Sequence, residues 1–239
     1  SAANRSRVFR VTGSRVTLAG MRISDGIGAD AGCVSAQGGD LVLHRVEVSN
    51  CRATGVSSVG AGGVYQTSGG SLLLSESSIT GNQALGTSTA GGLAVDGAAR
   101  ILRSTISGNV IVSNISNTGA GVSSVSNNLI VIDSTITTNI VRGSSQAAGI
   151  VKVSSGPVNI SNSVVAGNVG GNADIVLFST STLVSGGYNA IGRIGNLTAT
   201  FNQPGDQFGT TTTPLEPVLS PLSYHGGTVP VHVPLLGSP

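Results

Sequence analysis

The sequence repeats itself about every 29 residues, and this period limits the folds that the chain can adopt. An Ala-Gly pair followed by an apolar residue recurs, and successive copies start 30, 29, 30 and 28 residues apart. The copies start at Ala31, Ala61, Ala90, Ala120 and Ala148. A fixed period of about 20–50 residues is typical of repeat architectures, in which each repeat packs on its neighbours.

A second pattern lies between these copies. It is an apolar pair whose members are five residues apart, with another nonpolar residue two positions earlier. The pairs are Leu18/Ile23, Leu43/Val48, Leu74/Ile79, Ile101/Ile106, Val131/Ile136 and Ile160/Val165. Alternating apolar residues closed by Gly or Asn indicate short strands. The repeat is too long for a hexapeptide solenoid and shorter than a propeller blade of about 40–45 residues. We therefore predict an all-β right-handed parallel β-helix, a solenoid with about 28–30 residues per coil.

Composition supports strands and excludes several classes of partner. Glycine contributes 36 of the 239 residues and charged residues only 9%, which argues against a helical protein. The net charge of +2 is no electrostatic footprint for nucleic acid. No apolar run approaches the ~20 residues that a membrane-spanning helix needs, so we expect no membrane span in this chain.

The register predicts that equivalent residues of successive coils lie over one another. Eight positions after the first member of each pair, four consecutive coils carry Asn82, Asn109, Asn139 and Asn168. Stacked amides pass hydrogen bonds from coil to coil, and Asn tolerates turns. A metal or glycan contact is the alternative, but amide stacking alone explains the repetition, so we interpret the column as a structural ladder.

A second column alternates in charge. Two positions after the first member of each pair lie Arg45, Glu76, Arg103 and Asp133. Opposite charges on adjacent strands attract by about 0.2–1 kcal/mol per pair, and like charges repel. We interpret this column as a salt ladder rather than a catalytic group, because Arg103 between Glu76 and Asp133 would hold both carboxylates ionised.

The repeat loosens after Val165, and seven of the eight prolines lie beyond residue 200. Because proline interrupts sheet pairing, we place the β-helix coils in residues 1–200. We expect residues 201–239 to be a Pro-rich cap of the same domain that lies across the open last coil. Docking of this segment on a neighbouring molecule or an anchor is the alternative.

The C-terminal motifs resemble those of a bacterial surface family. The segments Tyr188–Gly192, Gly205–Thr210, Pro214–Leu222, Gly226–His232 and Leu235–Pro239 stand in the order of the "GG-x-N-x-IG", "GD-x-x-G-T", "DP-x-LGPL", "NGG-x-T-x-T-H" and "L-x-GSPAIDAG" motifs. That order is similar to the choice-of-anchor Q domain proteins and the related polymorphic-outer-membrane-protein-like β-helices. The resemblance implies export and display on a bacterial surface, and it implies no established catalysis.

The chain departs from the family pattern at several positions. Glu216 stands where the family usually has Asp, His225 where it has Asn, and Val231 where it has Thr. The last residues, Ser238-Pro239, come before the "AIDAG" of the motif. We therefore expect the chain to be a fragment of a longer protein.

We expect no catalytic, cofactor-binding or metal-binding residues. Hydrolysis of glycosides needs carboxylates about 5–9.5 Å apart, and the register scatters the ten acidic residues among turns and columns. The three histidines are also dispersed. An ice-binding face would need repeated Thr-x-Thr rows, and Thr135/Thr137 is the one such row in this column. Tyr65 is our candidate for ligand contact, because exposed aromatic rings on a solenoid flank stack on sugars.

The cysteines and the ends of the solenoid leave alternatives open. Cys33 and Cys51 either form a disulfide, which suits a secreted protein, or are two buried thiols. The first coil edge, around Val8, Val11 and Val16, would pair with preceding chain or with another copy. We expect a non-enzymatic extracellular or cell-surface scaffold or adhesin-like module that binds copies of itself head to tail, or a surface glycan or protein. The alternative is a carbohydrate-binding or polysaccharide-degrading, pectate-lyase-like β-helix.

Overall fold

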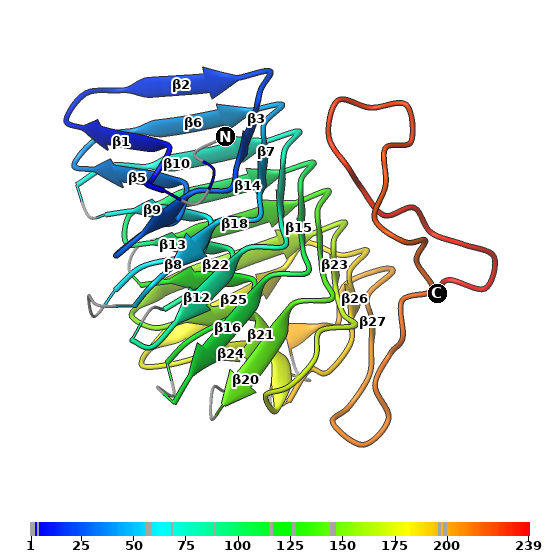
Figure 1. Ribbon diagram of the computed structural model, residues 1–239. Coiled ribbons are helices and arrows are strands. Elements are labelled where there is room, and N and C mark those ends of the chain that lie inside the picture. The colour runs from blue at the N-terminus through cyan, green and yellow to red at the C-terminus, as the bar shows by residue number, and fades with distance from the viewer. Residues whose placement is uncertain are drawn as a thin grey trace.

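The structure is a computed structural model, and it describes residues 3, 5–55, 59–67, 69–87, 89–114, 117–125, 128–143, 147–195, 197 and 200–239. Its strands form four parallel sheets: each described coil adds a strand to sheets A, B and C, and the first five coils also add one to sheet D. Figure 1 shows the coils stacked from β1–β4 at one end to β24–β27 at the other. The fold is a right-handed parallel β-solenoid, which confirms the predicted fold class.

The strands of sheets A and B form two walls of the solenoid. Sheet A contains β1 (Phe9–Thr12), β5 (Val34–Gln37), β9 (Val64–Gln66), β13 (Leu93–Val95), β17 (Val122–Ser124), β21 (Ala147–Lys152) and β24 (Ala173–Leu177). Sheet B contains β2 (Val16–Ala19), β6 (Leu41–His44), β10 (Leu72–Ser75), β14 (Ala99–Leu102), β18 (Leu129–Ile132), β22 (Gly156–Ser161) and β25 (Ser181–Ser185).

Sheets C and D contain the remaining strands. Sheet C contains β3 (Arg22–Ser24), β7 (Glu47–Ser49), β11 (Ser78–Thr80), β15 (Thr105–Ser107), β19 (Thr135–Thr137), β23 (Val164–Val165), β26 (Ala190–Ile191) and β27 (Gln207–Phe208). Sheet D contains β4 (Ile27–Gly28), β8 (Arg52–Ala53), β12 (Gln83–Leu85), β16 (Val110–Ser113) and β20 (Ile140–Gly143).

The predicted register is confirmed at each apolar pair. Leu43 in sheet B lies beside Leu18 and Leu74, and this column continues through the first members of the later pairs. In sheet C, Val48 lies beside Ile23 and Ile79, and the second members continue in the same way. The two columns are buried in one apolar core between the sheets. Ladders of Val, Ile and Leu therefore hold the coils at the strand spacing of about 4.8 Å.

The Ala-Gly repeat has a steric cause. A Cβ on Gly32 would lie 2.2 Å from the carbonyl oxygen of Gly62, and a Cβ on Gly62 would lie 2.2 Å from that of Gly91. Only glycine permits this approach of successive coils. In the later coils Gly119 rather than Ala120 pairs with Ala90, so the Ala-Gly copies are offset by one residue there. The strands that follow remain in register, because their apolar residues must face the core: Leu93 pairs with Val122, and Val122 with Ile150.

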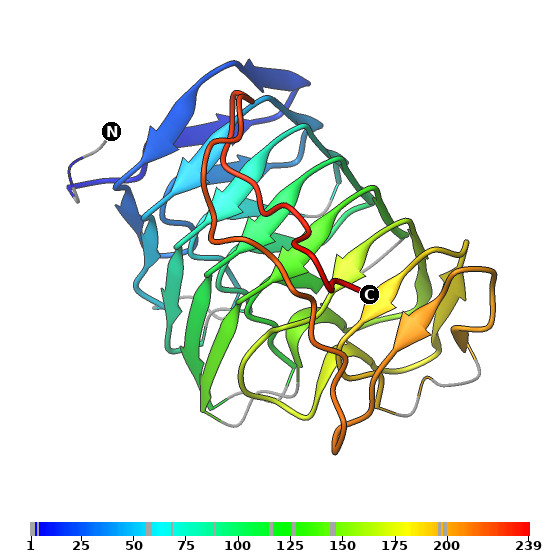
Figure 2. The same cartoon turned by 90° about the vertical axis from the view of Figure 1, so that its right-hand side faces the viewer.

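The C-terminal segment differs from the expected cap. Ile194 and Phe201 are buried at the end of the apolar core, and Leu197 packs against it. After β27 the chain leaves the last coil, and residues 215–239, called the strap below, run back across the outer face of sheet C (Figure 2). The strap folds as a hairpin with antiparallel bridges Leu219–Pro234 and Ser223–Val231. Its prolines lack the N–H groups needed to extend a parallel sheet, so it lies on the flank instead.

Candidate functional site

The charged column occupies a left-handed turn between sheets B and C. Arg45, Glu76, Arg103 and Asp133 have φ angles of 54°, 50°, 46° and 52°. Glu76 Oε2 accepts from Arg45 Nε at 2.9 Å, and Glu76 Oε1 accepts from Arg103 Nη2 at 3.3 Å. Asp133 accepts from Asn162 Nδ2 at 2.6 Å. The structure thus brings three of the four charges into one ion-paired row and gives Asp133 an amide partner.

The chemistry of this row is that of an ion-pair network. The hydrogen bond from Arg45 is the main cause that lowers the pKa of Glu76, and Arg103 acts in the same direction. A general acid at neutral pH needs a raised pKa. Glu76 is therefore suited to hold two arginines and unsuited to donate a proton.

The four asparagines form one continuous buried chain of amides. Asn82 Nδ2 donates to Asn109 Oδ1, Asn109 Nδ2 to Asn139 Oδ1, and Asn139 Nδ2 to Asn168 Oδ1, each at 2.9 Å. Each oxygen also accepts a backbone N–H of the preceding coil, beginning with Cys51 N at 2.9 Å from Asn82 Oδ1. Because these amides bond to one another and to backbone in the coil interior, they offer no ligand a free group.

The amide chain ends in a buried ion pair. Asn168 Nδ2 donates to Asp174 Oδ1 at 2.8 Å, and Asp174 Oδ2 lies 3.5 Å from Arg193 Nε. Burial raises the pKa of Asp174, while the Asn168 and Arg193 contacts oppose that rise. The guanidinium of Arg193 also donates to the carbonyl oxygens of Asn168, Gly170 and Gly171. This pair closes the ladder at the C-terminal end of the solenoid.

At the other end of the column the two cysteines are bonded. Cys33 and Cys51 form a disulfide with a Cα–Cα distance of 5.5 Å. Cys51 precedes Asn82 in the column, so the crosslink begins where the amide chain begins. The disulfide ties the segment just before β5, where Cys33 lies, to the turn between β7 and β8, where Cys51 lies.

A serine ladder, which the sequence analysis does not predict, runs beside the charged column. Ser77, Ser104, Ser134 and Ser163 follow the charged column by one residue. Each hydroxyl accepts a backbone N–H from the preceding coil at 3.0–3.2 Å. In the sequence this ladder is visible as a serine that recurs three residues after the first member of the last four apolar pairs. Such a recurrent serine indicates a turn in which a backbone N–H needs a hydrogen-bond acceptor.

Tyr65 does not lie where a bound glycan would reach it. Its side chain packs against Ala31, Ala61 and Ala90, and the residue is 8% exposed. The hydroxyl donates to Asp96 Oδ2 at 3.0 Å, and burial raises the pKa of Tyr65 above its usual range. The ring is covered, so the exposed aromatic surface on which the expected ligand contact of Tyr65 depends is not present in the fold.

Lys152 is a further buried ionisable group that the sequence pattern does not point to. It lies in β21 and is fully buried. Its Nζ donates to the carbonyl oxygens of Val125 at 3.3 Å and Ser155 at 3.2 Å. Burial lowers the pKa of Lys152. Its apolar stem fills the core while its amine bonds to two carbonyls, a structural role.

The outer face of sheet C is lined with small hydroxyl side chains. On successive strands it presents Ser24, Ser49, Ser78/Thr80, Thr105/Ser107 and Thr135/Thr137. All of these except Thr135 are less than 9% exposed. Outward residues of sheet B, such as Thr17 and Arg100, are exposed. The strap seen over sheet C in Figure 2 explains this difference.

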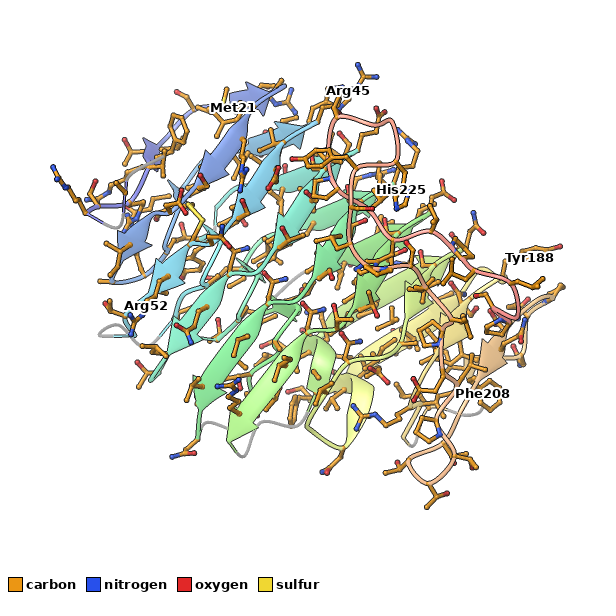
Figure 3. The ribbon with its side chains drawn as sticks, turned by 45° about the vertical axis from the view of Figure 1, so that its right-hand side comes forward. Met21, Arg45, Arg52, Tyr188, Phe208 and His225 are labelled. Carbon is orange, nitrogen blue, oxygen red and sulfur yellow. A yellow bond between two sulfur atoms is a disulfide. The ribbon has the colours of Figure 1, made fainter. Side chains whose placement is uncertain are left out.

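Two side-chain contacts hold the strap on this face. Tyr224 donates its hydroxyl to Glu47 Oε2, and Glu47 also pairs with Arg22 at 3.2 Å. His232 Nε2 lies 2.7 Å from Ser107 Oγ, and its Nδ1 lies 2.7 Å from the carbonyl oxygen of Ser220. In Figure 3 the strap, marked by His225, lies in front of the sheet. Val229 and Pro230 are the buried apolar residues between the two contacts.

The serine–histidine contact has part of the geometry of an activated nucleophile. The carbonyl of Ser220 orients the His232 ring, and its Nε2 faces a serine hydroxyl. However, Ser107 is 2% exposed, and the neighbouring amide of Gly108 already donates to Thr138 Oγ1 at 3.1 Å. The contact therefore lacks an oxyanion donor at that position, and it serves to fasten the strap.

The acidic side chains are almost all engaged within the fold. Counting contacts among the described residues, nine of the ten accept hydrogen bonds from protein groups: Asp25, Asp30, Asp40, Glu47, Glu76, Asp96, Asp133, Asp174 and Asp206. Glu216 lines a groove between the strap and sheet C together with His232. Among the described residues no cluster of His, Cys, Asp or Glu is suited to hold a metal ion. Nor does the described part of the chain contain a helix long and apolar enough to cross a bilayer.

Comparison of the chain with models of protein families, with curated proteins and with solved structures found no match. The parallel β-solenoid, which the family resemblance implies, is shown by the coordinates. The site that the coordinates offer is the hydroxyl face of sheet C with the strap across it.

Proposed function

We propose that this protein is a non-enzymatic β-solenoid scaffold that is exported and works outside the cell or on its surface. The observation that carries the proposal is that nine of the ten carboxylates, and the whole amide column, are bonded to other groups within the described part of the chain. Glycoside hydrolysis needs a pair of carboxylates available to substrate. Carboxylates that hold neighbouring protein groups in place support a rigid rod and are less available for that chemistry.

The disulfide supports the proposed location. Disulfides persist in secreted and surface proteins and are rare in the reducing cytosol. The Cys33–Cys51 crosslink is buried, with both residues at most 1% exposed. The order of the C-terminal motifs supports the same conclusion through its resemblance to choice-of-anchor Q and polymorphic-outer-membrane-protein-like surface proteins. We include membership of that group, and an adhesin-like role, in the proposal.

End-to-end association is part of the proposed scaffold role. Within the described part of the chain, strands β1 to β4 each have a parallel neighbour on one side only, and Val8, Val11 and Val16 are partly buried hydrophobic residues beside the core there. Such an edge pairs readily with another strand. Light scattering over a range of protein concentrations tests this: growth of the particle mass supports it, and a constant monomer mass rejects it.

An activity assay tests the absence of catalysis. The protein is incubated with polygalacturonate, with and without calcium, and with neutral polysaccharides, while unsaturated products and new reducing ends are measured. We expect neither to form above the buffer control. If products form, the Glu216→Gln variant decides whether the carboxylate in the strap groove is responsible. Formation of either product by the purified protein, above the buffer control, would contradict the scaffold proposal.

A further inference from the structure

We propose that the strap is displaceable and that the hydroxyl face of sheet C beneath it binds an extended, uncharged polyhydroxyl chain such as a neutral polysaccharide. This goes beyond the scaffold role, since it assigns a ligand class to a specific surface.

The first argument is the mismatch between the face and its cover. Val229 and Pro230 of the strap are buried, while the sheet below presents two columns of Ser and Thr hydroxyls. The hydroxyl of Ser78 is fully buried and, within the described part of the chain, has no hydrogen-bond partner. A buried hydroxyl without a partner is destabilising, because no hydrogen bond replaces the one it made with water. A face built only to pack against an apolar strap would carry apolar residues in its place.

The second argument is the chemistry of the face. Hydroxyls both donate and accept, so a regular row of them can match the hydroxyls of a sugar chain in either sense. The rows repeat at the strand spacing of about 4.8 Å along the solenoid. The charged residues of these outward columns, Arg22 and Glu47, neutralise each other at one end. An acidic polysaccharide would therefore find no unpaired cation on this face, which favours a neutral ligand.

The third argument is the light attachment of the strap. Most strap residues are exposed, including Tyr224 at 57% and Leu236 at 103%. Side-chain hydrogen bonds join it to the sheet at Tyr224–Glu47 and His232–Ser107. When these two open, Glu47 keeps Arg22 and Ser49, and Ser107 keeps Thr138. Removal of the strap therefore leaves Glu47 and Ser107 with hydrogen-bond partners on the solenoid itself.

Opening is measured with a thiol reporter in the full chain. The Ser78→Cys substitution puts one free thiol under the strap, since the two native cysteines are joined. The rate at which this thiol reacts with a maleimide is measured in two proteins: one with Ser78→Cys alone, and one that also carries Tyr224→Phe and His232→Ala. We expect at least a tenfold faster reaction in the combined variant. His225→Ala is the matched control, because His225 contacts Ser220 and Ser223 of the strap itself, and it should leave the rate unchanged.

Binding is then measured on the opened protein. Retardation in gels containing hydroxyethyl cellulose, galactomannan or dextran is compared with retardation by polygalacturonate. We expect at least one neutral polymer to retard the Tyr224→Phe/His232→Ala protein several-fold more than the wild type, and to slow maleimide reaction of the reporter at least threefold.

Each contrary outcome overturns the proposal. If the Ser78→Cys thiol stays unreactive in the Tyr224→Phe/His232→Ala protein, and also when Val229→Asp places a charge at a buried strap residue, the strap is a permanent cover. If no neutral polymer binds, if only polygalacturonate binds, or if bound polymer fails to protect the thiol, the assigned ligand or surface is wrong. These readouts involve no catalysis, so their failure is distinguishable from failure of the scaffold proposal.

Discussion

At the scale of single residues, the inward and outward polar side chains have opposite consequences for stability. Asn109 accepts from the backbone and side-chain amides of Asn82 and donates to Ile79 O and Asn139 Oδ1. Ser78, in contrast, has a hydroxyl with no partner under the strap. A polar group inside this fold stabilises it only when all of its bonding capacity is met.

The Asn109→Ala substitution tests the amide ladder. It leaves Asn82 N–H and Ile79 C=O without their partners in a buried turn, at about 1–3 kcal/mol per group. We expect the free energy of unfolding in urea to fall by about 3 kcal/mol or more. Asn128→Ala, at an exposed asparagine, is the control and should change it by less than about 0.5 kcal/mol. Equal effects of the two would show that the ladder contributes nothing specific.

The Ser78→Ala substitution tests the mismatch under the strap. Removing a buried hydroxyl without a partner takes away a desolvation cost, so we expect a gain of about 1 kcal/mol in the free energy of unfolding. Ser104→Ala is its counterpart, because Ser104 Oγ accepts from Ser77 N and donates to Leu102 O. That variant should lose about 1 kcal/mol in the same urea titration. Loss of stability in Ser78→Ala would mean that its hydroxyl is satisfied in solution.

At the scale of elements, the charged row links the turns of three successive coils. Because the Arg45 contact lowers the pKa of Glu76 in the folded state, the carboxylate stabilises the fold above its ordinary pKa of 4.5. That contribution is lost as the pH falls through the lowered folded value. We expect Glu76→Gln to lower the midpoint of thermal unfolding at neutral pH, and the difference from wild type to disappear in acid. Glu216→Gln, on the strap, is the control, and its difference from wild type should not depend on pH in this way.

The elements also show what was predictable from sequence. The apolar pairs predicted the strands and their register because a solenoid repeats every environment at one offset, as Leu43 and Leu74 illustrate. The strap offered no such period. Its contacts join Tyr224 to Glu47 and His232 to Ser107, 177 and 125 residues apart, and each occurs once. Tyr65 was misplaced because its burial depends on neighbouring alanines that only the folded return segments bring together.

At the scale of the whole molecule, the coils near the two ends of the rod are held together by different means. In a solenoid each coil contacts only its neighbours, so local unfolding starts at the ends. At one end the Cys33–Cys51 bond links residues 18 apart in sequence. At the other end Asp174–Arg193 and the buried residues Ile194 and Phe201 cover the core. The disulfide and the C-terminal contacts act on different coils, so their effects on stability are separable.

The Cys33→Ser/Cys51→Ser variant tests this separation. Loss of a crosslink over a loop of this size costs about 2–4 kcal/mol, and a rod with neighbour-only contacts should show that cost near the break. We expect amide hydrogen exchange to accelerate in β3–β8, while β22–β26 keep their wild-type rates and serve as the internal control. Reduction of the wild-type protein should give the same pattern. Uniform acceleration along the chain would instead show that the solenoid unfolds as one cooperative unit, in which case an end crosslink stabilises every coil equally.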